Sequence, residues 1–234
     1  MPAEPFQSYS LSHWIVITLL LIFLTVATYY HRRNPESRPA RLTRTTLLIL
    51  NLTACLSTFA AHWFSGLRSN LDTLIPFHFC DVMAFVGAAA LITRKPLLCE
   101  TTYYLGLGAT LQGLLTPNLQ QAFPHPVFFS FFQLHFATVA TALFLPLALQ
   151  WRPRRPLWKT TLKALLLANT YLLCATLVNL ILGTNFAFLM HKPENPSLFD
   201  HLGPHPWYLL STQLLALLVM TILSLPFLRS PPPR

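Results

Sequence analysis

Apolar residues in this chain fall into seven long runs, which short polar segments separate. Each run holds about 20 residues, the length that an α-helix needs to cross a hydrocarbon core of about 30 Å. The pattern therefore predicts an all-α bundle of seven transmembrane helices, forming one domain over residues 1–228, followed by a disordered tail over 229–234. The predicted spans are 11–30, 45–64, 74–93, 97–116, 126–150, 161–182 and 207–228.

The composition supports a membrane protein. Hydrophobic residues make up 53% of the chain and charged residues only 10%, whereas a soluble domain is about 25% charged. The net charge of +9 would indicate nucleic-acid binding in a soluble protein. Here the basic residues lie in short segments between apolar runs, so membrane orientation explains them and we expect no nucleic-acid partner.

The basic residues also predict the orientation of the bundle. If the N-terminus is outside, fourteen of the sixteen Lys and Arg residues are cytoplasmic, and only Arg68 and Lys192 are outside. The cytoplasmic segments are then 31–44, 94–95, 151–163 and 229–234. This asymmetry favours an outer N-terminus and a cytoplasmic C-terminus. The first run ends at several arginines, which indicates a spanning helix rather than a cleaved leader.

Two local features, one at a span end and one between spans, carry smaller predictions. Glu100 follows Arg94 and Lys95 closely in the sequence, and we expect it to form an ion pair with one of them. In the long outer segment, Ser197 is followed three residues later by Asp200, a spacing typical of a helix start. We therefore expect one short helix there.

The candidate chemistry lies inside the third and fifth predicted spans. The fifth carries Gln133 and His135 about two turns inside the membrane, where a polar side chain needs a partner or a function. The third carries His78, Cys80 and Asp81, with His78 and Asp81 spaced to share one helix face. Both sets descend from the outer side, so Asp81 could meet His135 and orient it as a general base. The alternative is a buried polar pair that ties two helices together.

Other polar residues near the outer face carry weaker signals. Asn118 and Asn185 could bind a polar group or simply cap helices. His201 and His205 are spaced as zinc ligands can be, but Gly203 lies between them and would interrupt a helix. No HExxH, GxSxG or phosphate-loop motif is present in the sequence. We therefore predict no metal site and no cofactor.

Three stretches together resemble a known family. They are IPFHFCD (75–81), LLTPNL with FFQLH (114–119 and 131–135), and NFAFLMHKP with SLFDHLGPHPWY (185–208). In this order they resemble the YwaF-type family of bacterial integral membrane proteins, which implies a multi-pass protein of the bacterial plasma membrane. That family is similar to a eukaryotic transmembrane acyltransferase that moves acyl chains onto phospholipids through a Cys and a His. The resemblance places the histidine at His135. The eukaryotic cysteine aligns with Phe77, and Cys80 is the candidate substitute.

Three functions remain open at this point. An acyltransferase would use Cys80 as nucleophile, His135 or His78 as base and Asp81 as the orienting carboxylate, with Asn118, Gln133 and Asn185 binding a phospholipid or lysophospholipid substrate from the outer leaflet. A transporter or small-molecule receptor would use the same residues as proton or ligand sites. A non-catalytic scaffold would need them only for stability. The sequence leaves the oligomeric state open.

Overall fold

The computed structural model describes residues 5–67 and 71–229, and the regular elements in these ranges are helices. One isolated antiparallel bridge joins Pro5 to Gln121. The α-helices are α1 (Leu11–Arg33), α2 (Arg38–Phe64), α3 (Leu71–Leu74), α4 (Phe79–Thr93), α5 (Pro96–Leu105), α6 (Leu111–Leu115), α7 (Pro126–Leu147), α8 (Leu157–Leu182) and α9 (Trp207–Ser224). Two predictions, on Arg68 and on most of the tail, concern positions outside the described residues.

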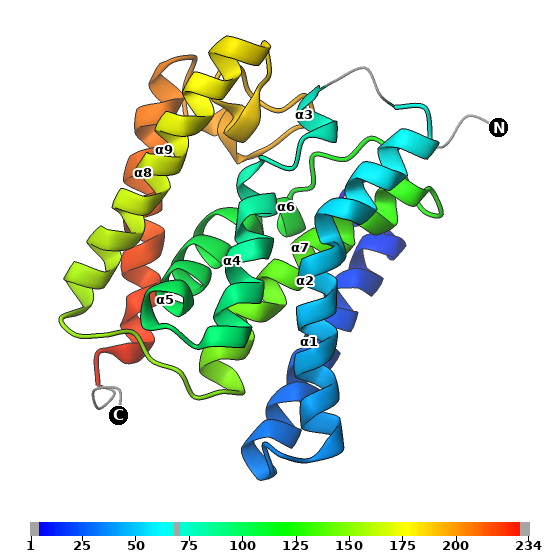
Figure 1. Ribbon diagram of the computed structural model, residues 1–234. Helices are drawn as coiled ribbons and strands as arrows, with labels where there is room; N and C mark the ends of the chain where they lie inside the picture. The colour runs from blue at the N-terminus through cyan, green and yellow to red at the C-terminus, as the bar shows by residue number, and fades with distance from the viewer. Residues whose placement is uncertain (1–4, 68–70, 230–234) are drawn as a thin grey trace.

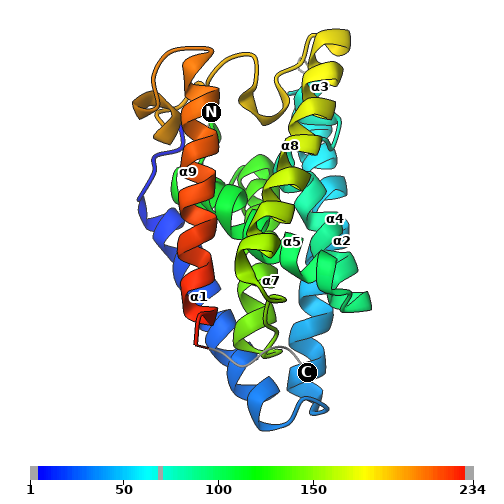
Figure 2. The ribbon, with the colours of Figure 1, turned by 90° about the vertical axis from the view of Figure 1, so that its left-hand side faces the viewer.

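The all-helical prediction is confirmed, and the protein is a multi-pass membrane protein. Six segments of the described chain are long and apolar enough to cross a membrane. They are α1, α2, α3 with α4, α7, α8 and α9 with its last turn. Figure 2 shows the α1–α2 turn at one end of the bundle, and α3 with the long segment 183–206 at the other.

The predicted span over 97–116 is built differently from the other six. It consists of α5, a π-helical turn at Gly106–Thr110 and α6. Gly106 allows a close approach to α7, because a Cβ placed there would lie 3.2 Å from Cβ of Ala142. The hydroxyl of Thr110 donates to Gly106 O within the π turn. Because the turn divides the segment, neither α-helical piece is long enough to span a bilayer alone.

The predicted span over 74–93 is also divided. Proline has no N–H and disfavours helical geometry in the residue before it, and Pro76 lies in an irregular segment between α3 and α4 rather than in a first helical turn. The chain restarts at His78, whose backbone N–H donates to Oδ2 of Asp81 at 2.9 Å. The third span is therefore broken beside its candidate chemistry.

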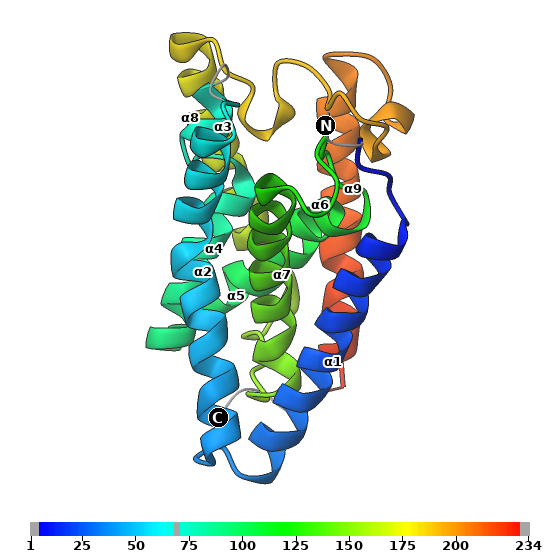
Figure 3. The same ribbon diagram turned by 90° about the vertical axis from the view of Figure 1, so that its right-hand side faces the viewer.

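The centre of the bundle is α7, which packs against α1, α2, α4 and α5 (Figures 1 and 3). In its most apolar stretch 72% of the residues are buried, against 39% or fewer in the other five candidate spans. Ala137, Ala140 and Ala142 are fully buried, and such small residues let helix backbones approach closely in a membrane. Nδ2 of Asn51 donates to Oγ1 of Thr141 at 2.8 Å, which ties α2 to α7.

One predicted ion pair is wrong. Glu100 pairs with Arg154, not with Arg94 or Lys95: Nε and Nη2 of Arg154 donate to the two carboxylate oxygens at 2.8 and 2.7 Å, and its backbone N–H donates to Oε1. Proximity in sequence misled the prediction, because Glu100 points into the bundle and its side chain is only 3% exposed. The paired carboxylate raises the pKa of the Arg154 guanidinium.

The long segment 183–206 is organised by side-chain hydrogen bonds. The predicted short helix is a 3₁₀ turn at Leu198–His201, and Oδ2 of Asp200 accepts the backbone N–H of Ser197 at 2.8 Å. At the end of α8, buried Asn179 accepts from Phe186 N at 2.8 Å and donates to Phe186 O at 3.0 Å. These contacts fix how the chain leaves α8.

Candidate functional site

The start of α4 brings three of the predicted site residues together. His78 is the N-cap, Cys80 lies in the first turn, and Asp81 is 5% exposed. Asp81 closes the helix start by accepting from the backbone of His78. The ring of His78 packs against Phe186 and Phe188, with ring centroids 5.2 and 5.8 Å apart.

A residue that the sequence analysis missed contacts the same carboxylate. Sγ of Cys55, from α2, lies 3.8 Å from Oδ1 of Asp81. Both carboxylate oxygens thus have a local partner, one in α2 and one at the N-cap. No sequence signal singled out Cys55, which is a lone cysteine in an apolar run.

His135 reaches the site from α7. Its Nδ1 lies 2.8 Å from Phe131 O, and a carbonyl can only accept, so Nδ1 carries the proton and donates it. The ring stacks on Phe131 at 4.2 Å between centroids. Its Nε2 edge faces α6: a Cβ placed on Gly113 would lie 2.3 Å from both Nε2 and Cδ2.

The predicted contact between Asp81 and His135 is not a direct hydrogen bond in the described part of the chain. Asp81 accepts from His78 and lies beside Cys55, while His135 donates to Phe131. Helices α4 and α7, which carry the two residues, are packed against each other. The site is therefore a cluster of neighbouring groups from α2, α4 and α7 rather than a hydrogen-bonded dyad.

Cys80 and a tyrosine complete the cluster. Cys80 packs against Ala54, Ala84 and Leu134, so its side chain lies beside α7 at the residue before His135. From α8, the hydroxyl of Tyr171 donates to Phe77 O at 2.8 Å. The sequence analysis missed Tyr171 because nothing in its apolar run indicates which face of the helix is turned inward.

Gln133 is directed elsewhere. Its Nε2 donates to Oγ1 of Thr53 at 2.9 Å and to Leu50 O at 3.2 Å, both in α2. Two residues along a helix lie on nearly opposite faces, which separates Gln133 from His135. Its hydrogen bonds tie α7 to α2.

The two predicted asparagines hold loops. Oδ1 of Asn118 accepts from Asn195 N at 3.3 Å. Both ends of the Asn185 amide form hydrogen bonds: Nδ2 donates to His191 O at 2.9 Å, and Oδ1 accepts from Met190 N at 2.9 Å. Within the described ranges, no group of three or more His, Cys, Asp or Glu side chains is placed to hold a metal ion.

These features define a class: a multi-pass α-helical membrane protein with a buried cluster of His, Cys and Asp inside its helix bundle. The chain belongs to the TMEM164 family, whose model matches residues 8–224. The match includes all three stretches that carry the family resemblance. Neither a curated protein nor a solved structure matches the chain.

Proposed function

We propose that the protein is a lipid acyltransferase whose site lies between α4 and α7. The observation that carries the proposal is the state of His135. Because Nδ1 donates its proton to Phe131 O, the neutral ring keeps its lone pair on Nε2 and can accept a proton there. The start of α4 supplies a thiol, Cys80, against the residue that precedes His135.

In the proposed reaction, Nε2 of His135 takes the proton of the Cys80 thiol while Sγ attacks an ester carbonyl carbon of a phospholipid. The ester C–O bond breaks, the proton passes to the leaving oxygen, and a lysophospholipid departs from the thioester. A hydroxyl of an acceptor lysophospholipid then attacks the thioester and gives its proton to Nε2. The departing Sγ takes that proton, which restores the thiol. One ester is exchanged for another, and no cofactor is needed.

Asp81 acts in this scheme as a positioning residue. It holds the start of α4 through His78 and contacts Cys55, so it fixes where the first turn of α4 places Cys80. His78 caps α4 and packs against Phe186.

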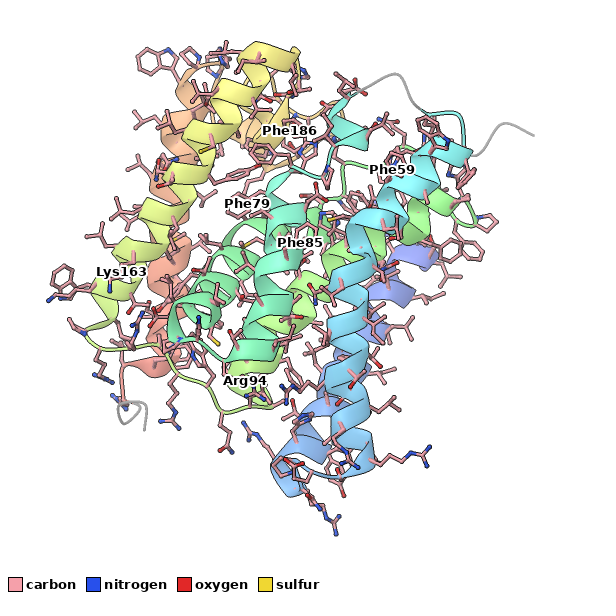
Figure 4. All side chains as sticks on the ribbon, viewed as in Figure 1. Phe59, Phe79, Phe85, Arg94, Lys163 and Phe186 are labelled. Carbon is pink, nitrogen blue, oxygen red and sulfur yellow. The ribbon has the colours of Figure 1, made fainter. Side chains whose placement is uncertain are left out.

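The proposed substrate enters from the outer leaflet, with the N-terminus outside and the C-terminus in the cytoplasm. The distribution of charge supports this orientation. Arg94 and Lys163 lie toward the end of the bundle opposite Phe186 (Figure 4), and Phe186 is the ring that His78 contacts. The site is therefore nearer the end with few basic residues, which the positive-inside rule places outside.

Purified protein in lipid nanodiscs tests the proposal directly. The nanodiscs contain a phospholipid with one isotopically labelled acyl chain and a lysophospholipid acceptor, and mass spectrometry follows the label. We expect the wild type to transfer label and His135→Ala to lose roughly 10²–10⁴-fold in rate. His62→Ala is the matched control, because Nδ1 of His62 makes the same local bond, to Thr58 O at 2.9 Å. No transfer by folded wild type, or full transfer by His135→Ala, would reject the proposal.

A further inference from the structure

The α8–α9 pair exposes more of its surface than the rest of the bundle. In the most apolar stretches of α8 and α9 only 11% and 17% of the residues are buried, and the two helices lie side by side at one edge in Figure 1. A shallow groove of about 520 Å³ runs along their seam. We call it the α8–α9 groove, and its lining includes Asn169, Leu173, Thr176, Trp207, Leu210 and Gln213.

An amide pair lies in this groove, inside the predicted spans of both helices, with Gln213 six residues, roughly 9 Å, beyond the start of α9 at Trp207. Asn169 is near the middle of α8, roughly 18–20 Å from either helix end at 1.5 Å per residue. Its Nδ2 donates to Leu165 O at 2.9 Å and to Oε1 of Gln213 at 3.1 Å. Both hydrogens of Nδ2 are thereby used, and so is one acceptor of Gln213.

The pair keeps hydrogen-bonding groups that the fold does not use. Among the described residues, Oδ1 of Asn169 and Nε2 of Gln213 have no hydrogen-bond partner, and Asn169 is exposed. Water is absent from the bilayer core and an acyl chain has no donor or acceptor, so leaving these groups toward lipid is unfavourable. The groove therefore favours a polar partner over a lipid tail.

We propose that a second copy of this chain covers the α8–α9 groove. The exposed groups are self-complementary, since one is an acceptor and the other a donor. A two-fold axis along the membrane normal lets Oδ1 of Asn169 accept from Nε2 of Gln213 of the second copy, and the reverse, in an isologous interface. Leu173 and Leu210, which are 65% and 58% exposed, supply apolar contacts beside the pair.

This interface is independent of the proposed acyl transfer. Tyr171, which bonds to Phe77 at the candidate site, is two residues from Asn169 and therefore on nearly the opposite face of α8. A dimer formed through the groove makes no contact with the face of α8 that carries Tyr171. Loss of dimerisation and loss of transfer are consequently separate readouts.

The test is the oligomeric state in liposomes, measured by single-molecule photobleaching of labelled full-length protein over a range of protein-to-lipid ratios. We expect the wild type to dimerise, and Asn169→Leu and Gln213→Leu each to weaken the dimer roughly tenfold, because each removes both intermolecular bonds. Thr170→Val is the matched control: Thr170 is exposed on the same helix but does not line the groove, and we expect wild-type dimerisation.

Three results would overturn the inference. A monomeric wild type at every ratio would do so, as would both leucine variants dimerising like the wild type. The third result is a monomeric wild type that co-purifies with a lipid which the Asn169→Leu variant does not bind. That lipid would then be the occupant of the groove. Both substituted residues face the membrane, and thermal unfolding of each variant verifies that it is folded.

Discussion

The imidazole of His135 lies against the backbone of Gly113, so close that a Cβ at Gly113 would be 2.3 Å from Nε2. No real pair of such atoms approaches so closely without a shift. The Cβ would meet the Nε2–Cδ2 edge of the ring, whose orientation is held by the hydrogen bond from Nδ1 to Phe131 O and by stacking on the Phe131 ring. Gly113 is thus required by the orientation of the ring.

Gly113→Ala tests this requirement. We expect the new methyl group to displace the His135 ring, with a loss of roughly 1–3 kcal/mol in the free energy of unfolding from overpacking, and a fall in acyl transfer. Gly108→Ala is the matched control, because its Cβ would meet only Cγ1 of Val219 at 4.0 Å. Thermal unfolding in detergent and the labelled-lipid assay check both variants. Equal behaviour of the two variants would refute the contact.

Cys80 and Cys55 are separated by their surroundings. The thiol of Cys55 already donates to a carboxylate oxygen of Asp81 at 3.8 Å, whereas Cys80 packs against Leu134, the residue before His135 in α7. We therefore expect Cys80→Ser to abolish transfer. Cys55→Ser, whose hydroxyl still donates to Asp81, should retain most of it. Trapping of the labelled acyl chain on the protein, read by mass spectrometry, identifies the sulfur, and a label on Cys55 would reverse the assignment.

The Glu100–Arg154 pair should contribute to stability. Arg154→Ala leaves the buried carboxylate with only the backbone N–H of residue 154 as a partner, and we expect the free energy of unfolding to fall by about 2–3 kcal/mol, since the partly exposed arginine is screened by solvent. Adding Glu100→Gln should recover part of the loss, because it removes the unpaired charge. Thermal unfolding of the two single variants and the double variant measures the coupling. Strictly additive losses would show that the pair is not coupled.

The sequence predicted the helices well and the orientation of their side chains poorly. Long apolar runs identify spans because the hydrocarbon core sets their length. Within such a run, however, lipid-facing and inward-facing residues are both apolar, so periodicity does not indicate which face is buried. Gln133 and His135 were placed together for that reason, although they face different neighbours. The local cap at Ser197, which depends on spacing alone, was predictable.

The contacts around the candidate site escaped prediction for a second reason. Cys55, Tyr171 and Gly113 reach it from three different helices, and only tertiary packing brings them together. Asp81 was expected to orient His135, but it accepts instead from the backbone N–H of His78, the N-cap of its own helix. A carboxylate at the third position of a helix can accept from the N-cap backbone N–H of the same helix, without any tertiary contact.

The π turn at Gly106–Thr110 sets the angular phase between the two halves of its segment. In a π turn each backbone hydrogen bond joins residues five apart, whereas in an α-helix it joins residues four apart. The π turn therefore holds one additional residue. Deleting one residue there would rotate everything beyond it by about 100° around the helix axis. The face that α5 presents to α8 would stay in place, while α6 would turn Gly113 away from α7 and present a bulkier residue to the imidazole. Because of that additional residue, α5 can pack against α8 while α6 presents Gly113 to α7.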